Sequence, residues 1–388
     1  MKTDLDQHFP AIADLEKQAI KRIPHFASEY LRGGIDQETA LKRNRDALDR
    51  IQIRPSYLLD RTDKPNDLST QILGQKFDLP FGISPIGLTG LMWPGAARYL
   101  AHAARVANIP IGLSNFATTP MSEFRELAQT NGWFQMYPAN DKAIRSKMVD
   151  DVKAAGFEVL ILTVDVPGLT RRHREFKVGL SVPPKINFRT ALSIAAKPSW
   201  AMSTALEGMP KFCNMQPYVS AGLNTAAQAQ AMTDLVVGPT SQDAIKQIRD
   251  RWPGKLLIKG IMSSEDAATA VRLGADGIWI SNHGGRQLDA MPSPVEVLSE
   301  LRSIVGPDFP ILADSGVRSG LDIAKMLTVG ADFVFLGRAF MYGVCALGST
   351  GPGHAIHILE EELRGVMTQV GCPTILDIKK KNNLPFER

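Results

Sequence analysis

The sequence has few cysteines, no long apolar run and little excess charge. Its three cysteines, Cys213, Cys345 and Cys372, form no CxxC pair, which argues against a disulfide framework and a zinc site. The first residues are charged, so we expect no signal peptide, and no apolar run reaches the ~18 residues that span a membrane. We therefore expect a cytoplasmic protein with reduced thiols.

The net charge and the histidine spacing argue against a nucleic-acid-binding protein and against a metal site. A net charge of +4 over 388 residues is too small to indicate nucleic-acid binding, although it would suit an anionic substrate or membrane surface. The seven histidines form no HxH or HExxH pattern, so we expect no metal site. With 44% hydrophobic residues, a chain of this length can bury a full core.

Eight short apolar runs recur along the chain, as expected for parallel strands that are buried on both faces. Helix-length stretches such as Glu265–Leu273 and Ser319–Val329 lie between them, and several end in a glycine, as helix C-termini often do. This rhythm predicts a (β/α)8 TIM barrel, with an open doubly wound sheet as the alternative. The runs are Phe81–Pro85, Pro110–Ser114, Trp133–Tyr137, Val159–Asp165, Leu256–Gly260, Gly277–Ser281, Ile311–Asp314 and Phe333–Gly337.

Two segments fall outside this repeat within what we expect to be a single domain over 1–388. An N-terminal extension, 1–80, should hold helices near 11–31 and 36–50 and an extended stretch at Gln71–Phe77. A long insertion after the fourth strand, 185–240, is rich in Ala, Met and aromatic residues. It is either a lid packed on the barrel or an interfacial membrane contact. The barrel itself should cover 81–350, and 351–388 should form a C-terminal helix and tail.

Polar residues and glycines stand where the strands end, and in a barrel these ends meet at one mouth. After the last two strands, Gly316 with Arg318 and Gly337 with Arg338 form a matched pattern. Glycines allow backbone N–H groups to approach a phosphate, and arginines supply charge-assisted hydrogen bonds. The pattern predicts a phosphate site, which would fit FMN, a sugar phosphate or a nucleotide.

His283 follows the sixth strand and precedes two glycines and Arg286. A histidine beside an arginine can bind a carboxylate and take a proton from the adjacent carbon or oxygen. A structural histidine is the alternative at this point.

The segment SNHGGRQLD (Ser281–Asp289) resembles the active-site signature of the FMN-dependent 2-hydroxy acid oxidases and dehydrogenases. The resemblance runs from EYLRGG (Glu29–Gly34) to LGRA (Leu336–Ala339). GMP (Gly208–Pro210), WPGKLLIKG (Trp252–Gly260) and GCP (Gly371–Pro373) resemble the bacterial L-mandelate and L-lactate dehydrogenases in particular.

The resemblance implies roles for the catalytic and substrate-binding residues. His283 matches the base, Asp165 its carboxylate partner and Lys259 the lysine beside the flavin ring. Arg172 and Arg286 match the pair that holds the substrate carboxylate. Tyr30 and Tyr137 match two tyrosines that hydrogen-bond the substrate, a small 2-hydroxy carboxylate.

The resemblance also implies that the cofactor is FMN. The positions that match its binding residues are Pro85, Ile86, Gly87, Ser114, Gln135, Thr163, Lys259, Ser281, Asp314, Gly316, Arg318, Gly337 and Arg338.

Two positions indicate the type of electron acceptor and the shape of the substrate pocket. Gly87 is typical of the dehydrogenase branch, which favours a quinone or cytochrome acceptor over an oxidase that reduces O2 to H2O2. Phe116 should shape the substrate pocket and could crowd a phenyl group. The resemblance further implies a homotetramer and peripheral contact with the inner face of the plasma membrane. The remaining alternative is a barrel that binds FMN or a sugar phosphate as an isomerase or as a non-catalytic binder.

Overall fold

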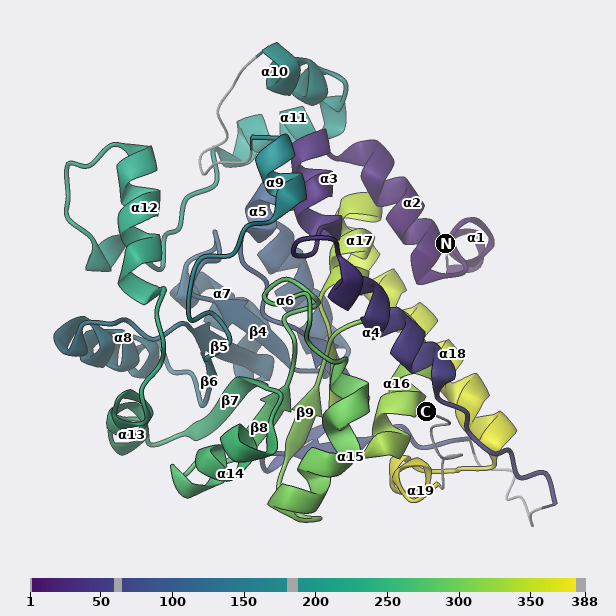
Figure 1. Cartoon of the computed structure of the whole chain (residues 1–388). Helices are drawn as coiled ribbons and strands as arrows, with labels where there is room; N and C mark the ends of the chain where they lie inside the picture. The colour runs from purple at the N-terminus through teal and green to yellow at the C-terminus, as the bar shows by residue number, and fades with distance from the viewer. Residues whose placement is uncertain (1, 59–64, 180–187, 382–388) are drawn as a thin grey trace.

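The computed structural model describes residues 2–58, 65–179 and 188–381. Within them, eight parallel strands close into a barrel in the order β10-β3-β4-β5-β6-β7-β8-β9 (Figure 1). The TIM barrel is therefore confirmed, and the open sheet is wrong. The strands are β3 (Phe81–Ile83), β4 (Ile111–Ser114), β5 (Gly132–Met136), β6 (Val159–Thr163), β7 (Lys255–Ile261), β8 (Gly277–Ile280), β9 (Ile311–Ala313) and β10 (Phe333–Leu336).

Aromatic side chains fill the inside of the barrel, and this explains why its strands are apolar throughout. Trp279 and Phe335 pack with ring centroids 4.1 Å apart, and Trp133 lies 5.5 Å from Phe335. Phe77 adds edge-on contacts to Trp133 and Phe333. It belongs to a hairpin of β1 (Thr70–Ile72) and β2 (Gln75–Phe77), where we expected a single extended stretch.

The helices that surround the barrel alternate with its strands as predicted. Gly156, Gly274 and Gly330 follow helices with φ of 80°, 79° and 125°, as expected for residues that end a helix. The helices are α5 (Thr89–Met92), α6 (Ala96–Val106), α7 (Met121–Ala128), α8 (Lys142–Ala154), α13 (Gln242–Arg251), α14 (Ser264–Arg272), α15 (Pro294–Val305), α16 (Gly320–Val329) and α17 (Arg338–Leu347), followed by α18 (Gly351–Val370) and α19 (Ile375–Lys379).

The N-terminal extension forms helices along one side of the barrel. One helix was expected near 11–31, but α2 (Ile12–Arg22) and α3 (His25–Arg32) are separate because Pro24 stands at the break. α1 (Lys2–His8) was not predicted. α2 packs on α17, and α4 (Thr39–Arg50) packs on α15 and α16 (Figure 1).

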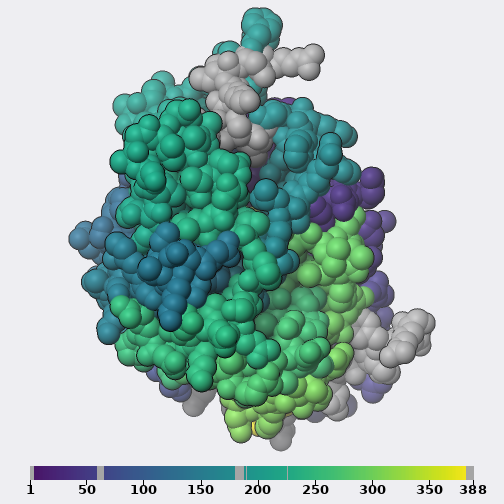
Figure 2. Space-filling model, turned by 60° about the vertical axis from the view of Figure 1, so that its left-hand side comes forward, coloured from purple at the N-terminus to yellow at the C-terminus, as the bar shows by residue number. Residues whose placement is uncertain are grey.

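The insertion is helical and gathers at one end of the molecule (Figures 1 and 2). It is partly packed and partly exposed: Trp200 is buried and donates to the Met92 carbonyl, whereas Met202 and Leu206 are exposed. In the described part of the chain, no helix combines the length and hydropathy needed to cross a bilayer. The helices after β6 are α9 (His173–Lys177), α10 (Phe188–Ala195), α11 (Pro198–Glu207) and α12 (Thr225–Val236). Residues 185–187 of the predicted insertion lie outside the described residues.

Candidate active site

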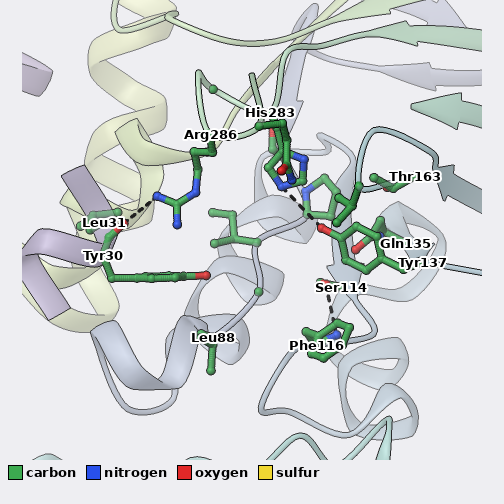
Figure 3. A pocket seen from close by; sticks show the side chains of 18 of the residues that line it. Tyr30, Leu31, Leu88, Ser114, Phe116, Gln135, Tyr137, Thr163, His283 and Arg286 are labelled. Carbon is green, nitrogen blue, oxygen red and sulfur yellow. Dashed lines mark hydrogen bonds between the residues drawn. The ribbon is translucent and has the colours of Figure 1, made fainter. Parts of the chain in front are cut away.

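One cavity of about 750 Å³ opens where the barrel strands end, a volume in the range of cofactor and ligand sites (Figure 3). Most of the residues that the sequence singles out line it. They are Tyr30, Pro85, Ile86, Gly87, Ser114, Gln135, Tyr137, Thr163, Arg172, Lys259, His283, Arg286, Asp314, Gly316, Arg318, Gly337 and Arg338. Asp165 and Ser281 lie just behind this lining, where they contact His283 and Lys259.

His283 is held between a carboxylate and the cavity. Its Nδ1 lies 3.0 and 3.1 Å from the two carboxylate oxygens of Asp165, while its Nε2 is 3.5 Å from the Tyr137 hydroxyl. The Asp165 contact places the proton on Nδ1 and leaves a lone pair on Nε2.

The protonation states of this pair follow from burial and charge. Burial lowers the pKa of His283, and Lys259 and Arg172 add to this, although Asp165 opposes them. Burial acts to raise the pKa of Asp165, but its contact with His283 and the charge of Lys259 lower the pKa overall. A neutral imidazole therefore stands against an ionised carboxylate.

Lys259 belongs to a buried polar network at the ends of β7, β8 and β9. Its Nζ donates to Ser281 Oγ at 2.8 Å and lies 3.3 Å from Asp314 Oδ2. Ser281 Oγ donates to Asp314 Oδ1 at 2.6 Å, and Trp279 Nε1 donates to the other oxygen at 3.1 Å. Because each member has partners, the ammonium group stays fixed at the floor of the cavity.

Arg172 and Arg286 converge on a carboxylate that the sequence analysis missed. Glu175 Oε1 lies 2.6 Å from Arg286 Nη2 and 3.4 Å from Arg172 Nη1. Arg286 Nη1 also donates to the carbonyls of Tyr30 and Gly33, and its guanidinium stacks on the Tyr30 ring at 4.7 Å. The available signal was an acid three residues after Arg172, which is contact spacing on a helix.

The expected phosphate end has backbone glycines and two arginines. Gly316 has a φ of 90°, and Gly337 precedes the ten-residue helix α17. Burial and the neighbouring Arg318 lower the pKa of Arg338 to about 9. Among the described residues, both arginines hydrogen-bond backbone carbonyls and neither forms an ion pair with a carboxylate, so their positive charges remain available to an anion in the cavity.

Arg338 also has a structural role that was not predicted. Its guanidinium donates to the carbonyls of Leu31, Gly33 and Gly284. It therefore ties the N-terminal extension to the loop of His283 while it offers positive charge to the cavity.

Among the described residues, three buried polar side-chain atoms at strand ends have no hydrogen-bond partner. They are Ser84 Oγ, Gln135 Nε2 and Thr163 Oγ1, and all three residues line the cavity. Because buried polar groups are almost always paired, these atoms indicate a bound group with both donors and acceptors. Ser84 was not among the predicted cofactor residues.

Comparison with known proteins identifies the family. The model of the FMN-dependent dehydrogenase family matches residues 19–384. The chain belongs to this family. The resemblance found at Ser281–Asp289 is thereby confirmed, and the protein is an FMN-dependent oxidoreductase.

Relatives match along nearly the whole chain. The (S)-mandelate dehydrogenase of Pseudomonas putida is 34% identical over 374 residues, which cover 96% of this chain and 93% of that enzyme. The L-lactate dehydrogenase of Vibrio cholerae is 36% identical over 371 residues, covering 95% and 97%. The crystal structure of the monotopic membrane protein (S)-mandelate dehydrogenase has a TM-score of 0.92 at 34% identity, covering 97% and 100%.

The cavity fits FMN at both of its ends. The unpartnered groups of Gln135 and Thr163 suit the flavin ring, which donates through an N–H group and accepts at its carbonyl oxygens and its other nitrogens. Arg318 and Arg338, with the backbone at Gly316, suit the phosphate.

Phe116 and Tyr137 lie near each other along one side of the cavity (Figure 3). Phe116 packs edge-on against Tyr137 at 5.8 Å and against Phe212 of the insertion at 5.2 Å. Ala229 and Thr233, on one face of α12, also line the cavity. Phe116 thus shapes the pocket as expected, together with the insertion.

Proposed function

We propose that this enzyme oxidises an L-2-hydroxy acid to the corresponding 2-keto acid. One observation carries the proposal: His283 presents Nε2 to the cavity beside the Tyr137 hydroxyl, with ionised Asp165 behind the ring and a pair of arginines nearby. A base opposite a carboxylate-binding pair suits a substrate with a carboxylate next to its reacting carbon.

Each substrate group has a matching side chain. The carboxylate binds Arg286 and Arg172, because planar guanidinium groups recognise carboxylates through paired hydrogen bonds. The hydroxyls of Tyr30 and Tyr137 hydrogen-bond the carboxylate and the 2-hydroxyl. Burial, with the charge of Asp165, raises the pKa of Tyr137, so its hydroxyl remains a proton donor.

His283 takes up one proton from the substrate, and Asp165 balances the charge that results. His283 Nε2 removes a proton from the H–C2–OH unit, and Asp165 then stabilises the imidazolium at Nδ1. Lys259 offers positive charge where negative charge develops at the floor of the cavity. A bound FMN would supply the acceptor for the remaining hydride equivalent, which is the two electrons and the second proton of the H–C2–OH unit.

The relatives named L-lactate and (S)-mandelate dehydrogenase define the range of substrates that we propose. The carboxylate clamp selects one end of the substrate only. The wall of Phe116 and Phe212 decides how large its side chain can be.

We further propose that electrons pass to a quinone or cytochrome at a membrane. Exposed apolar side chains gather on the insertion, and the related mandelate dehydrogenase is a monotopic membrane protein. These side chains are Phe188, Leu192, Met202, Leu206 and Met209. Contact with the inner face of the plasma membrane and a homotetrameric assembly belong to this proposal.

Substitution of the proposed base, His283, tests the function. His283→Ala should bind FMN and fold normally but lose at least a hundredfold in turnover with L-2-hydroxy acids, the usual scale for a general base. His102→Ala, on the exposed side of α6, is the matched control and should keep native turnover. Turnover within twofold of native in His283→Ala would refute the assignment.

A further inference from the structure

The loop that carries His283 is held from outside the barrel by α4. Asn44 of α4 and Asn282 form a reciprocal pair of amide hydrogen bonds, 2.9 Å in one direction and 2.7 Å in the other. Both side chains are fully buried, at 0% and 1% exposure. Asn282 also accepts from the Gly285 N–H at 3.1 Å and donates to the Pro292 carbonyl at 3.0 Å, so its bonding capacity is filled.

The backbone beside this pair adopts a conformation that the surroundings must impose. His283 has a φ of 57°, and Gly284 and Gly285 follow with 66° and 75°. A histidine rarely adopts the left-handed region, and such residues persist only where their neighbours fix them. The Gly285 N–H donates both to the Asn282 carbonyl at 3.0 Å and to its side-chain oxygen at 3.1 Å, so the Asn282 side chain reinforces the turn, and Asn44 fixes the orientation of that side chain.

The same helix also touches the loop at the phosphate end. A side chain at Gly316 would come within 2.8 Å of the Asn44 carbonyl oxygen, so the two backbones are in close contact. Arg45, the next residue of α4, donates to the Gly316 carbonyl at 2.6 Å. One turn of α4 therefore contacts both the base loop and the phosphate loop.

We propose that Asn44 is a positioning residue that holds His283 in register with the cofactor site. It acts through its amide pair with Asn282 on one loop and through its backbone on the other. Although it lies in the N-terminal extension and touches neither the base nor the cavity, it completes the active site. The proposal rests on the role of His283 in the proposed function.

The position of His283 has a measurable signature. The groups that face its imidazole are Asp165, Lys259, Arg172 and Tyr137, and burial among them keeps the pKa of His283 below its ordinary value. If the turn loosens, the ring becomes more exposed to water, and its pKa should rise toward the ordinary value of about 6.5.

The test compares Asn44→Ala with Asn66→Ala. Asn66 makes comparable hydrogen bonds to the Arg364 carbonyl and Thr368, far from the cavity. Native FMN-loaded protein and each variant are labelled with [13C]histidine, and His283 is titrated by NMR without substrate. Thermal unfolding, kcat and KM are measured on the same samples.

We expect Asn44→Ala to keep its fold and its FMN, and the pKa of His283 to shift upward. The variant's kcat should fall about ten- to a hundredfold, which is the usual loss when a catalytic group is displaced. KM should change less than kcat. Adding Asn44→Ala to Asn282→Ala should lower kcat little further, because Asn44 acts through Asn282. Asn66→Ala should affect thermal unfolding alone.

A native His283 titration and native kcat in Asn44→Ala, with only a lower Tm, would overturn the proposal. If Asn44→Ala does not fold, the isosteric Asn44→Asp, which loses the bond donated to Asn282, provides the same comparison. Because the titration needs no substrate, it stands even if the proposed substrate class is wrong. Failure of the proposed function would instead appear as native turnover in His283→Ala.

Discussion

Glu175 contacts both arginines that we propose as the substrate clamp, since one of its oxygens lies 2.6 Å from Arg286 and 3.4 Å from Arg172. Burial lowers the pKa of Arg286, and repulsion from the neighbouring guanidinium of Arg172 lowers this pKa further. The carboxylate between them offsets the repulsion and fixes their spacing.

We predict that Glu175→Gln raises KM for the 2-hydroxy acid about three- to tenfold, the range of a partly exposed ion pair, with kcat within twofold. Steady-state kinetics at several concentrations separates the two constants. The control is Glu361→Gln, an exposed position on α18. An unchanged or lower KM in Glu175→Gln would show that the carboxylate does not support the clamp.

The pH dependence should follow His283. Burial lowers its pKa below the ordinary ~6.5, so the base is neutral at pH 7 and gains a proton only in more acidic solution. We therefore predict that kcat/KM is flat near pH 7 and falls as the pH drops through this lowered pKa. A pH profile that falls already above pH 7 on the acid side would contradict this.

Asp165→Asn should change that profile in a defined direction. Asp165 raises the pKa of His283, so its loss should move the acid limb to still lower pH. The maximal kcat should fall at least a hundredfold, because the imidazolium loses its counter-charge. An acid limb that moves to higher pH would be inconsistent with the hydrogen-bonded pair.

Gly316→Ala should weaken FMN binding at least tenfold and lower the Tm. An alanine there would have a φ of 90° and a Cβ only 2.8 Å from the Asn44 carbonyl oxygen. Gly306→Ala is the matched control, because Gly306 has a φ of 86° but open space around it. Flavin fluorescence during reconstitution measures the affinity. If both variants had equal effects, backbone strain alone would explain them, and the predicted crowding at Gly316 would be contradicted.

Membrane contact can be tested on the exposed face of α11. Replacing Met202 and Leu206 together by Ser should release the enzyme from anionic phospholipid vesicles, because both side chains are largely exposed and apolar. Leu376→Ser, at another exposed apolar position near the C-terminal end, should leave binding unchanged. Sedimentation with vesicles measures the bound fraction, and full retention of the double variant would exclude this face.

The barrel could be predicted because its strands are buried on both faces, which leaves continuous runs such as Val159–Thr163 in the sequence. His283 could be located because it follows a strand end within a specific motif, and Arg172 and Arg286 could be located by the resemblance of their own segments to the family. The positioning role of Asn44 could not be predicted, because its partner Asn282 is 238 residues away in the sequence. An asparagine in a polar helix also carries no local signal. Glu175 was missed for a related reason, since an acid in a basic run suggests a solvated surface pair.

An anaerobic titration of the FMN-loaded enzyme tests most directly whether it oxidises an L-2-hydroxy acid with His283 as the base and the arginine pair as the carboxylate clamp. L-lactate, L-mandelate and their D enantiomers are added in turn while flavin absorbance is recorded, for the native enzyme and for His283→Ala. We predict that at least one L acid bleaches the flavin of the native enzyme, that the D acids do not, and that His283→Ala stays yellow. Bleaching of His283→Ala at the native rate, or of the native enzyme by no 2-hydroxy acid, would contradict the account.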